Sequence, residues 1–82
     1  MKKPMFAIRD SKVGFLSPAV DVNTATARRN FAVAVRDGDS LLHSMPSDFA
    51  LYHVADWDDE TGLPSPLPTP ELVCYGDDFT ED

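Results

Sequence analysis

The chain has 82 residues, of which 43% are hydrophobic, and a formal net charge of −7 at pH 7. A chain this short forms one domain, and an enclosed active site of several hundred cubic ångströms would use most of its core, which disfavours an enzyme. The single cysteine, Cys74, cannot form an internal disulfide, and no apolar run approaches the roughly 20 residues that cross a bilayer; both features predict a cytoplasmic protein without a membrane anchor.

Charge is distributed unevenly along the chain. All seven Lys and Arg residues fall within residues 1–36, which hold two acids, whereas residues 37–82 hold twelve acids and no Lys or Arg. The asymmetry predicts either a basic binding face opposed by an acidic one, or two halves whose charges meet when they pack. Because the whole domain is acidic, we do not expect tight unaided binding to nucleic acid.

The first half of the chain predicts one strand and the main helix. Residues 5–10 form the strand, and a loop with Gly14 and Pro18 follows it. The helix is expected at residues 24–37, with Asn23 or Asp21 as its N-cap and Gly38 as a left-handed residue after its last turn. At 100° per residue, one side of this helix gathers Thr24, Ala27, Phe31, Ala34 and Val35, and another gathers Arg28, Arg29, Ala32 and Arg36.

The most apolar stretch, residues 49–57, predicts a central strand because both of its alternating faces carry apolar or aromatic side chains. An acidic turn follows, in which Gly62 supplies a positive φ, so the chain should reverse into a hairpin. The next segment, residues 63–67, carries prolines and must be either a strand at a sheet edge or merely an extended segment. Thr69 and Pro70 suit the start of a short helical turn within residues 68–76.

These elements together predict an α+β fold, a small antiparallel β-sheet with one main α-helix packed on it. Residues 1–76 form the single domain, and residues 77–82 form an acidic C-terminal tail in which Phe79 can dock on a basic partner. The exposed sheet edges are compatible with a homodimer formed by strand pairing.

No cofactor or metal site is predicted. His43, His53 and Cys74 match no zinc-ligand spacing. Asp56, Asp58 and Glu60 alternate as calcium ligands do, but Gly62 comes one position late and Leu67 stands where a closing glutamate is needed. A hydrolase or nuclease that uses these three carboxylates with a metal would need convergent groups that a turn rarely supplies.

Several segments in this order resemble a known family. They are F-A-I-R-D-S-K at residues 6–12, the helix core with Ala27, Arg29 and Phe31, the block P-S-D-F-A-L-Y-H-V-A-D-W-D-D-E-T-G at residues 46–62, and Pro70 with Leu72. This pattern is similar to the small nonstructural protein of gokushovirus-type microviruses, which are bacteriophages with circular single-stranded DNA. The resemblance covers most of residues 5–72.

The resemblance implies a noncatalytic nonstructural phage protein of the bacterial host cytoplasm, one that engages single-stranded DNA at the switch from replication to genome synthesis and packaging. A single-strand binder pairs a positive groove with aromatic platforms. The expected phosphate-binding residues are Lys12, Arg28, Arg29 and Arg36, with possible platforms at Phe6, Phe15, Tyr52 and Trp57. Because the net charge opposes binding, contact with DNA is expected to be weak, or assisted by phage replication or capsid proteins.

A second hypothesis is an acidic adaptor that binds a basic phage or host protein and not DNA. Its contact residues would lie in the reverse turn and the C-terminal tail, at Glu60, Asp77, Asp78 and Phe79.

Overall fold

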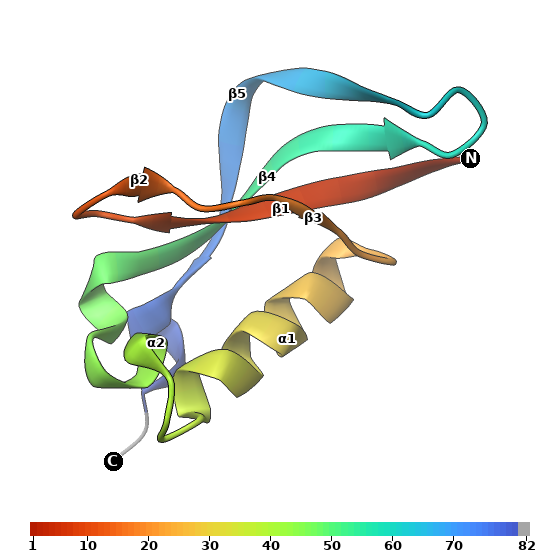
Figure 1. The fold of residues 1–82 in the computed structure, drawn as a ribbon. Helices are drawn as coiled ribbons and strands as arrows, with labels where there is room; N and C mark the ends of the chain where they lie inside the picture. Colours follow the sequence, from red (N-terminus) through yellow and green to blue (C-terminus); the bar gives the residue numbers. More distant parts are fainter. Residues whose placement is uncertain (81–82) are drawn as a thin grey trace.

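The computed structural model describes residues 1–80 and has the predicted α+β architecture, a curled antiparallel sheet with one main helix (Figure 1). The elements in chain order are β1 (Lys2–Asp10), β2 (Gly14–Phe15), β3 (Ala19–Val20), α1 (Thr24–Arg36), α2 (Leu41–Ser44), the 3₁₀ turn η1 (Pro46–Asp48), β4 (Phe49–Asp58), β5 (Leu63–Tyr75) and the 3₁₀ turn η2 (Gly76–Phe79).

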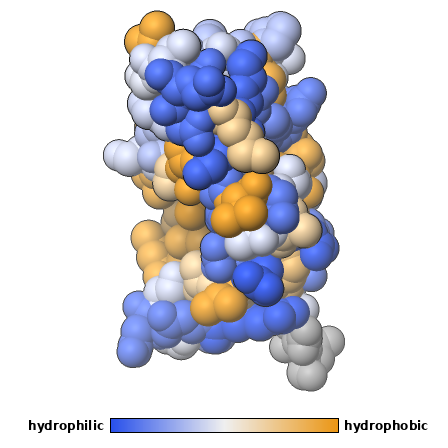
Figure 2. All heavy atoms as spheres, turned by 90° about the vertical axis from the view of Figure 1, so that its right-hand side faces the viewer, coloured by the Kyte–Doolittle hydropathy of each residue, from blue (hydrophilic) through white to orange (hydrophobic). Residues whose placement is uncertain are grey.

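The sheet has the strand order β2-β1-β4-β5, and β3 pairs with β1 beyond the end of β2. The stretch predicted as the central strand is therefore central, since β4 lies between β1 and β5. Helix α1 lies against one face of the sheet, and the β4–β5 hairpin extends away from it beside the N-terminus (Figure 1). Seen from the right-hand side of that view, apolar side chains gather in the middle of the molecule between two mostly hydrophilic ends (Figure 2).

The ends of α1 follow the predicted capping only in part. Asn23 is the N-cap, and its side chain accepts a hydrogen bond from the backbone N–H of Thr26 at 2.8 Å. Gly38 was predicted to be left-handed, which is wrong, because positive φ occurs only at Gly14 and Gly62 within residues 1–80. The helix instead ends at Asp37, an extended residue whose N–H donates to the carbonyl of Ala34.

The β4–β5 hairpin is longer than the sequence predicted. Gly62 has the expected positive φ, 74°, and its N–H donates to the carbonyl of Asp58 at 2.8 Å. Strand β5 then continues to Tyr75, so the predicted helical turn within residues 68–76 is wrong. Alternate prolines favour extended backbone at the residues before them, which explains the long strand.

Strand β5 is an edge strand, as its prolines require. Pro64 pairs with Trp57 and Pro66 with Ala55. Since proline has no N–H to donate, these nitrogens must point away from β4, toward the outer edge. The outer edge of β5 therefore lacks donors at these positions, which opposes the addition of another strand there.

The core lies between α1, the sheet and the C-terminal turn η2. Its buried members are Phe6, Ala27, Phe31, Ala32, Val35, Phe49, Leu51, Cys74 and Phe79. Two of them correct the sequence analysis. Ala32 was placed on the arginine side of the helix but is 6% exposed, and Phe79 was placed in an acidic tail outside the domain but is also 6% exposed.

The burial of Ala32 and that of Phe79 have the same cause, because the ring of Phe79 packs on the helix. Its ring lies 6.1 Å from that of Phe31, centroid to centroid, and the guanidinium carbons of Arg28 and Arg36 lie 4.8 and 5.6 Å from its centroid. Arg28, Ala32 and Arg36 follow one another at intervals of four residues and so share one helix face, with the small alanine between two long cations. That face holds the ring of Phe79, and residues 76–79 belong to the fold; residues 81–82 of the predicted tail lie outside the described residues.

Gly76 fixes the approach of η2 to η1. A Cβ atom at Gly76 would lie 2.2 Å from the carbonyl oxygen of Pro46, closer than van der Waals contact permits. Only glycine therefore allows the two turns to pack as they do, and this packing delivers Phe79 to the core.

We expect Gly76→Ala to destabilise the fold by about 1–3 kcal/mol, the usual cost of overpacking, because backbone must move away from backbone. The matched control is Gly38→Ala, since Gly38 has no neighbour within 4 Å and no positive φ. Urea unfolding of both variants measures the difference. Equal midpoints for the two variants would contradict the proposed role of Gly76.

Candidate nucleic-acid interface

The face of the sheet that points away from α1 carries most of the accessible aromatic side chains. Because side chains alternate along a strand, residues paired across neighbouring strands form rows on one face. Phe6, Ile8 and Leu51 pack toward the helix, so the intervening residues form the other face. We call this the open face, and its rows are Phe15–Arg9–Ala50–Tyr75, Ala7–Tyr52–Leu72, Met5–Ala55–Pro66 and Lys3–Trp57–Pro64.

Aromatic rings stand on this face above small residues. The rings of Phe15 and Tyr52 meet edge to face with centroids 5.3 Å apart, although β1 runs between their strands. Ala7, the β1 residue paired with Tyr52, is small enough to leave room for both rings and is only 4% exposed. Phe15 and Tyr75 remain about half exposed, at 47% and 52%. The open face therefore offers accessible rings on a rigid support.

The charge of the open face differs from that of the whole protein. Its rows contain Arg9 and Lys3 but no carboxylate. The four strand acids occupy the alternate positions that face the helix side of the sheet: Asp10, Asp56, Asp58 and Glu71. Arg9 forms no ion pair with any residue of the described part of the chain, whereas Lys3 Nζ lies 4.0 Å from an Asp59 oxygen. Alternation thus gives an acidic protein one face that is locally cationic.

The structure does not bring the four predicted phosphate-binding residues together. Lys12 lies in the turn between β1 and β2, next to the end of the open face that holds Arg9 and Phe15. Arg28, Arg29 and Arg36 lie on α1, on the other side of the sheet, where Arg28 and Arg36 cover Phe79 and Arg29 is exposed.

Of the predicted aromatic platforms, the open face joins Phe15, Tyr52 and Trp57, while Phe6 is buried in the core. Arg9, Lys3 and Tyr75 were missed. Arg9 alternates with Phe6 and Ile8 in β1, so the period of two could have placed it on the open face. Tyr75 could not be placed because its segment was predicted as a helical turn.

The four predicted protein-contact residues already have partners within the fold. Glu60 Oε2 accepts a hydrogen bond from the Met1 ammonium at 2.8 Å, and both carboxylate oxygens of Asp77 lie 3.0 Å from the Ser47 hydroxyl. Asp78 accepts from the backbone N–H of Tyr75 at 2.8 Å. Phe79 is buried, which corrects its expected role as an exposed docking residue.

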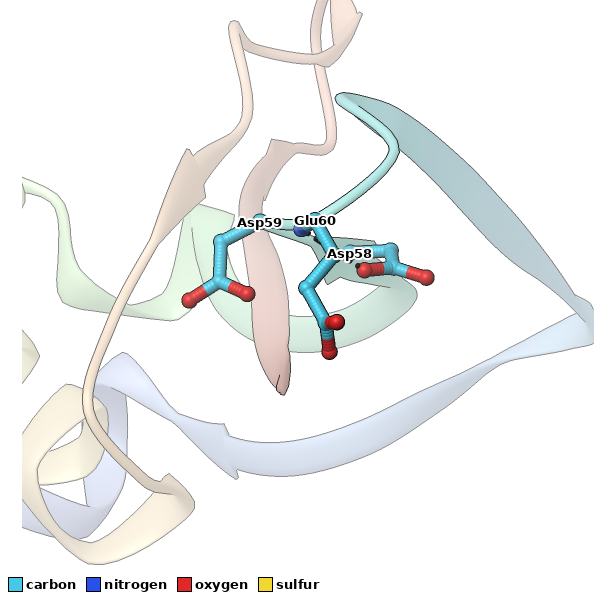
Figure 3. A group of neighbouring side chains, drawn as sticks. All are labelled: Asp58, Asp59 and Glu60. Atoms are coloured by element: carbon cyan, nitrogen blue, oxygen red, sulfur yellow. Dashed lines mark hydrogen bonds between the residues drawn. The ribbon is translucent and has the colours of Figure 1, made fainter.

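The acidic turn is the one place in residues 1–80 where three carboxylates converge. The metal-binding atoms of Asp58, Asp59 and Glu60 all lie within 4.8 Å of one another, and the three side chains project from the same turn (Figure 3). Two of the three already face a cation, because the Met1 ammonium lies 2.8 Å from Asp59 Oδ1 and from Glu60 Oε2. Asp56, which alternates with Asp58 and Glu60 in the sequence, does not belong to this group and instead pairs with His53 Nε2 at 2.9 Å.

These contacts shift the ionisation of the groups in the turn. Hydrogen bonds from the Met1 ammonium to Asp59 and Glu60 raise the pKa of the amine. The same ammonium lowers the pKa of Asp59, and the backbone N–H of Glu60 lowers the pKa of Asp58. The N-terminus therefore holds the tip of the hairpin electrostatically.

Cys74 is a core residue whose thiol is shielded from solvent. It is 3% exposed, and burial raises the pKa of its thiol to about 11. The two histidines lie elsewhere, with His43 Nδ1 3.0 Å from the Val35 carbonyl and His53 beside Asp56. None of the three forms a close metal-binding group with other described residues.

The fold and the open face define a small α+β protein with an aromatic, locally basic sheet surface. The family model described as "Phage ORF5 protein" matches residues 3–79, nearly the whole chain. The protein therefore belongs to the phage ORF5 protein family. No curated protein and no solved structure matches it. Within the described residues, no helix combines the length and the apolar character that a membrane crossing needs.

The ion pairs of the N-terminus predict a pH dependence of stability. A raised amine pKa stabilises the fold below the unfolded value of 8.0, and this contribution is lost as the pH rises through the folded value. The lowered pKa values of Asp58 and Asp59 stabilise the fold above 3.8, and this contribution is lost as the pH falls.

Acetylation of the Met1 amine isolates this contribution from other titrations. We expect the urea midpoint of the free-amine protein to exceed that of the acetylated protein between about pH 4 and pH 8, with the two converging outside this range. Equal midpoints throughout would show that the ion pairs contribute nothing to stability.

Proposed function

We propose that this phage protein is a noncatalytic accessory factor that binds single-stranded DNA through its open face. One observation carries the proposal: four aromatic side chains and two cations share one face of the sheet without a carboxylate in its rows. Proteins that bind single strands combine stacking platforms with cations that follow the backbone. Phe15, Tyr52, Tyr75 and Trp57 supply the platforms here.

Single-stranded rather than duplex DNA fits this surface. Aromatic side chains stack on bases that are exposed, and in a duplex the bases are already stacked on each other. Duplex binding depends chiefly on phosphate contacts, which a protein with a net charge of −7 supports poorly. The aromatic contribution is available only from an unpaired strand.

Phosphate contacts come from Arg9, Lys3 and Lys12, which lie on the open face or in the turn at its end. With at most three such contacts, log Kd should rise with log salt concentration with a slope of about 2. Binding of this kind is weak at physiological salt, which supports a role together with phage replication or capsid proteins. The resemblance to microvirus nonstructural proteins supports action in the host cytoplasm, at the switch from replication to genome synthesis and packaging.

Fluorescence anisotropy with labelled oligo(dT) and with a duplex of equal length, at low salt, tests the proposal. We expect the single strand to bind more tightly than the duplex. Phe15→Ala and Tyr75→Ala should each weaken single-strand binding by about 5- to 150-fold, the cost of one lost stacking contact. Both residues are about half exposed, so these truncations should leave the fold intact.

The matched pair Arg9→Ala and Arg29→Ala separates the two candidate surfaces. Both are exposed arginines, one on the open face and one on α1. We expect Arg9→Ala to reduce both affinity and salt dependence and Arg29→Ala to change neither. The opposite result would place the interface on the helix. Absence of binding to any single strand at low salt would overturn the proposal and favour a protein-binding adaptor.

A further inference from the structure

A separate pocket lies between α1 and the sheet, on the side away from the open face. Its volume is about 210 Å³. Phe6, Ile8 and Leu51 form its sheet side, and Ala27, Phe31 and Ala34 form its helix side. The space exists because the helix presents alanines at two of these positions. An apolar cavity of about 150 Å³ in another protein stays dry and holds benzene, so this pocket has room for one small ring system.

The lining of the pocket includes a carboxylate. Asp21 is half-buried there, and its two oxygens accept hydrogen bonds from the Val22 N–H at 2.7 Å and the Asn30 side-chain amide at 3.0 Å. Each carboxylate oxygen has a second lone pair, so Asp21 can accept from a further donor. No basic residue lines the pocket. A ligand that fills the apolar part and reaches Asp21 must therefore offer a donor at its edge.

We propose that this pocket binds a small planar ring that carries an N–H donor. Free indoles and free nucleobases such as adenine share this chemistry. The apolar walls account for the ring, and the negative charge of Asp21, the one charged side chain of the lining, accounts for the donor. This site is independent of the open face and does not rest on DNA binding.

Calorimetric titration of the full chain with indole, benzofuran and adenine tests the ligand chemistry. Benzofuran has the shape of indole with an oxygen in place of the N–H group. We expect indole to bind roughly 10-fold or more tightly than benzofuran, because a hydrogen bond to a charged acceptor is lost. Adenine binding that exceeds indole binding would identify a nucleobase site, and the reverse order an indole site. Equal binding of indole and benzofuran, or no binding of any ring, would overturn the proposal.

Variants locate the site. Ala34→Leu should fill the pocket and abolish indole binding, whereas Ala25→Leu, on an exposed helix position outside the pocket, should leave it unchanged. Asp21→Asn should reduce the preference for indole over benzofuran to less than about 3-fold while the ring still binds; this variant adds no bulk, so it tests the site even if Ala34→Leu fails to fold. Unchanged indole binding by a folded Ala34→Leu variant, or an unchanged preference in Asp21→Asn, would refute the assignment.

Discussion

The alternation of side chains along β4 is the constraint on which the rest of this structure depends. Phe49 and Leu51 point into the core beneath α1, whereas Ala50 and Tyr52 belong to the open face. Because β4 pairs with β1 on one side and β5 on the other, its register determines which residues of those strands face the core and which belong to the open face. A slip of one residue would exchange the two faces, placing aromatic rings and alanines against the helix. The core and the candidate interface are thus two consequences of one pairing.

The C-terminal turn η2 completes the core where α1 meets β4 and β5. Phe79 supplies a ring that Arg28 and Arg36 cover, so two of the three helix arginines serve packing through their stems and their charge. The close contact of Gly76 with Pro46 brings this ring into place. The positive charge of α1 is therefore directed in part toward the protein itself. Arg9 is exposed on the open face and forms no ion pair within residues 1–80, which makes it the better candidate for contact with phosphate.

Local patterns determined how much of the fold could be predicted from the sequence. Asn23, the observed N-cap, was one of the two predicted candidates. The turn at Gly62 and the two-sided strand at residues 49–57 are each encoded within a few residues, and both were predicted correctly. The C-terminal segment was not, because its conformation depends on distant partners. The end of β5, from Glu71 to Tyr75, is extended because β4 pairs with it. Phe79 is buried because α1 offers a small residue between two arginines.

The candidate site was less predictable than the fold for a related reason. Phe15, Tyr52 and Trp57 were predicted as platforms for stacking. They share a face only because of the register in which β1 pairs with β2 and β4, and this register could not be read from the sequence alone. The helix arginines were predicted as phosphate-binding residues because the residues that share a helix face can be identified from their spacing in the sequence. The residues that align across neighbouring strands cannot be identified in this way. Which residues align across a sheet depends on turns and bulges, such as the irregularity between Met5 and Phe6.

The acids of the strands and the residues of the open face occupy alternate positions and so lie on opposite sides of the sheet. This separation of charge affects how an acidic protein can approach DNA. Net charge governs attraction at distances beyond the Debye length of about 8–10 Å, where this protein repels a polyanion. At contact, the local surface decides, and there the strand acids point to the opposite side of the sheet while the rings and Arg9 remain accessible. Under the proposed function, we expect this surface to bind a strand slowly and to hold it mainly by stacking. A partner protein that delivers the strand would overcome the long-range repulsion, which is the physical reason to expect assisted rather than autonomous binding.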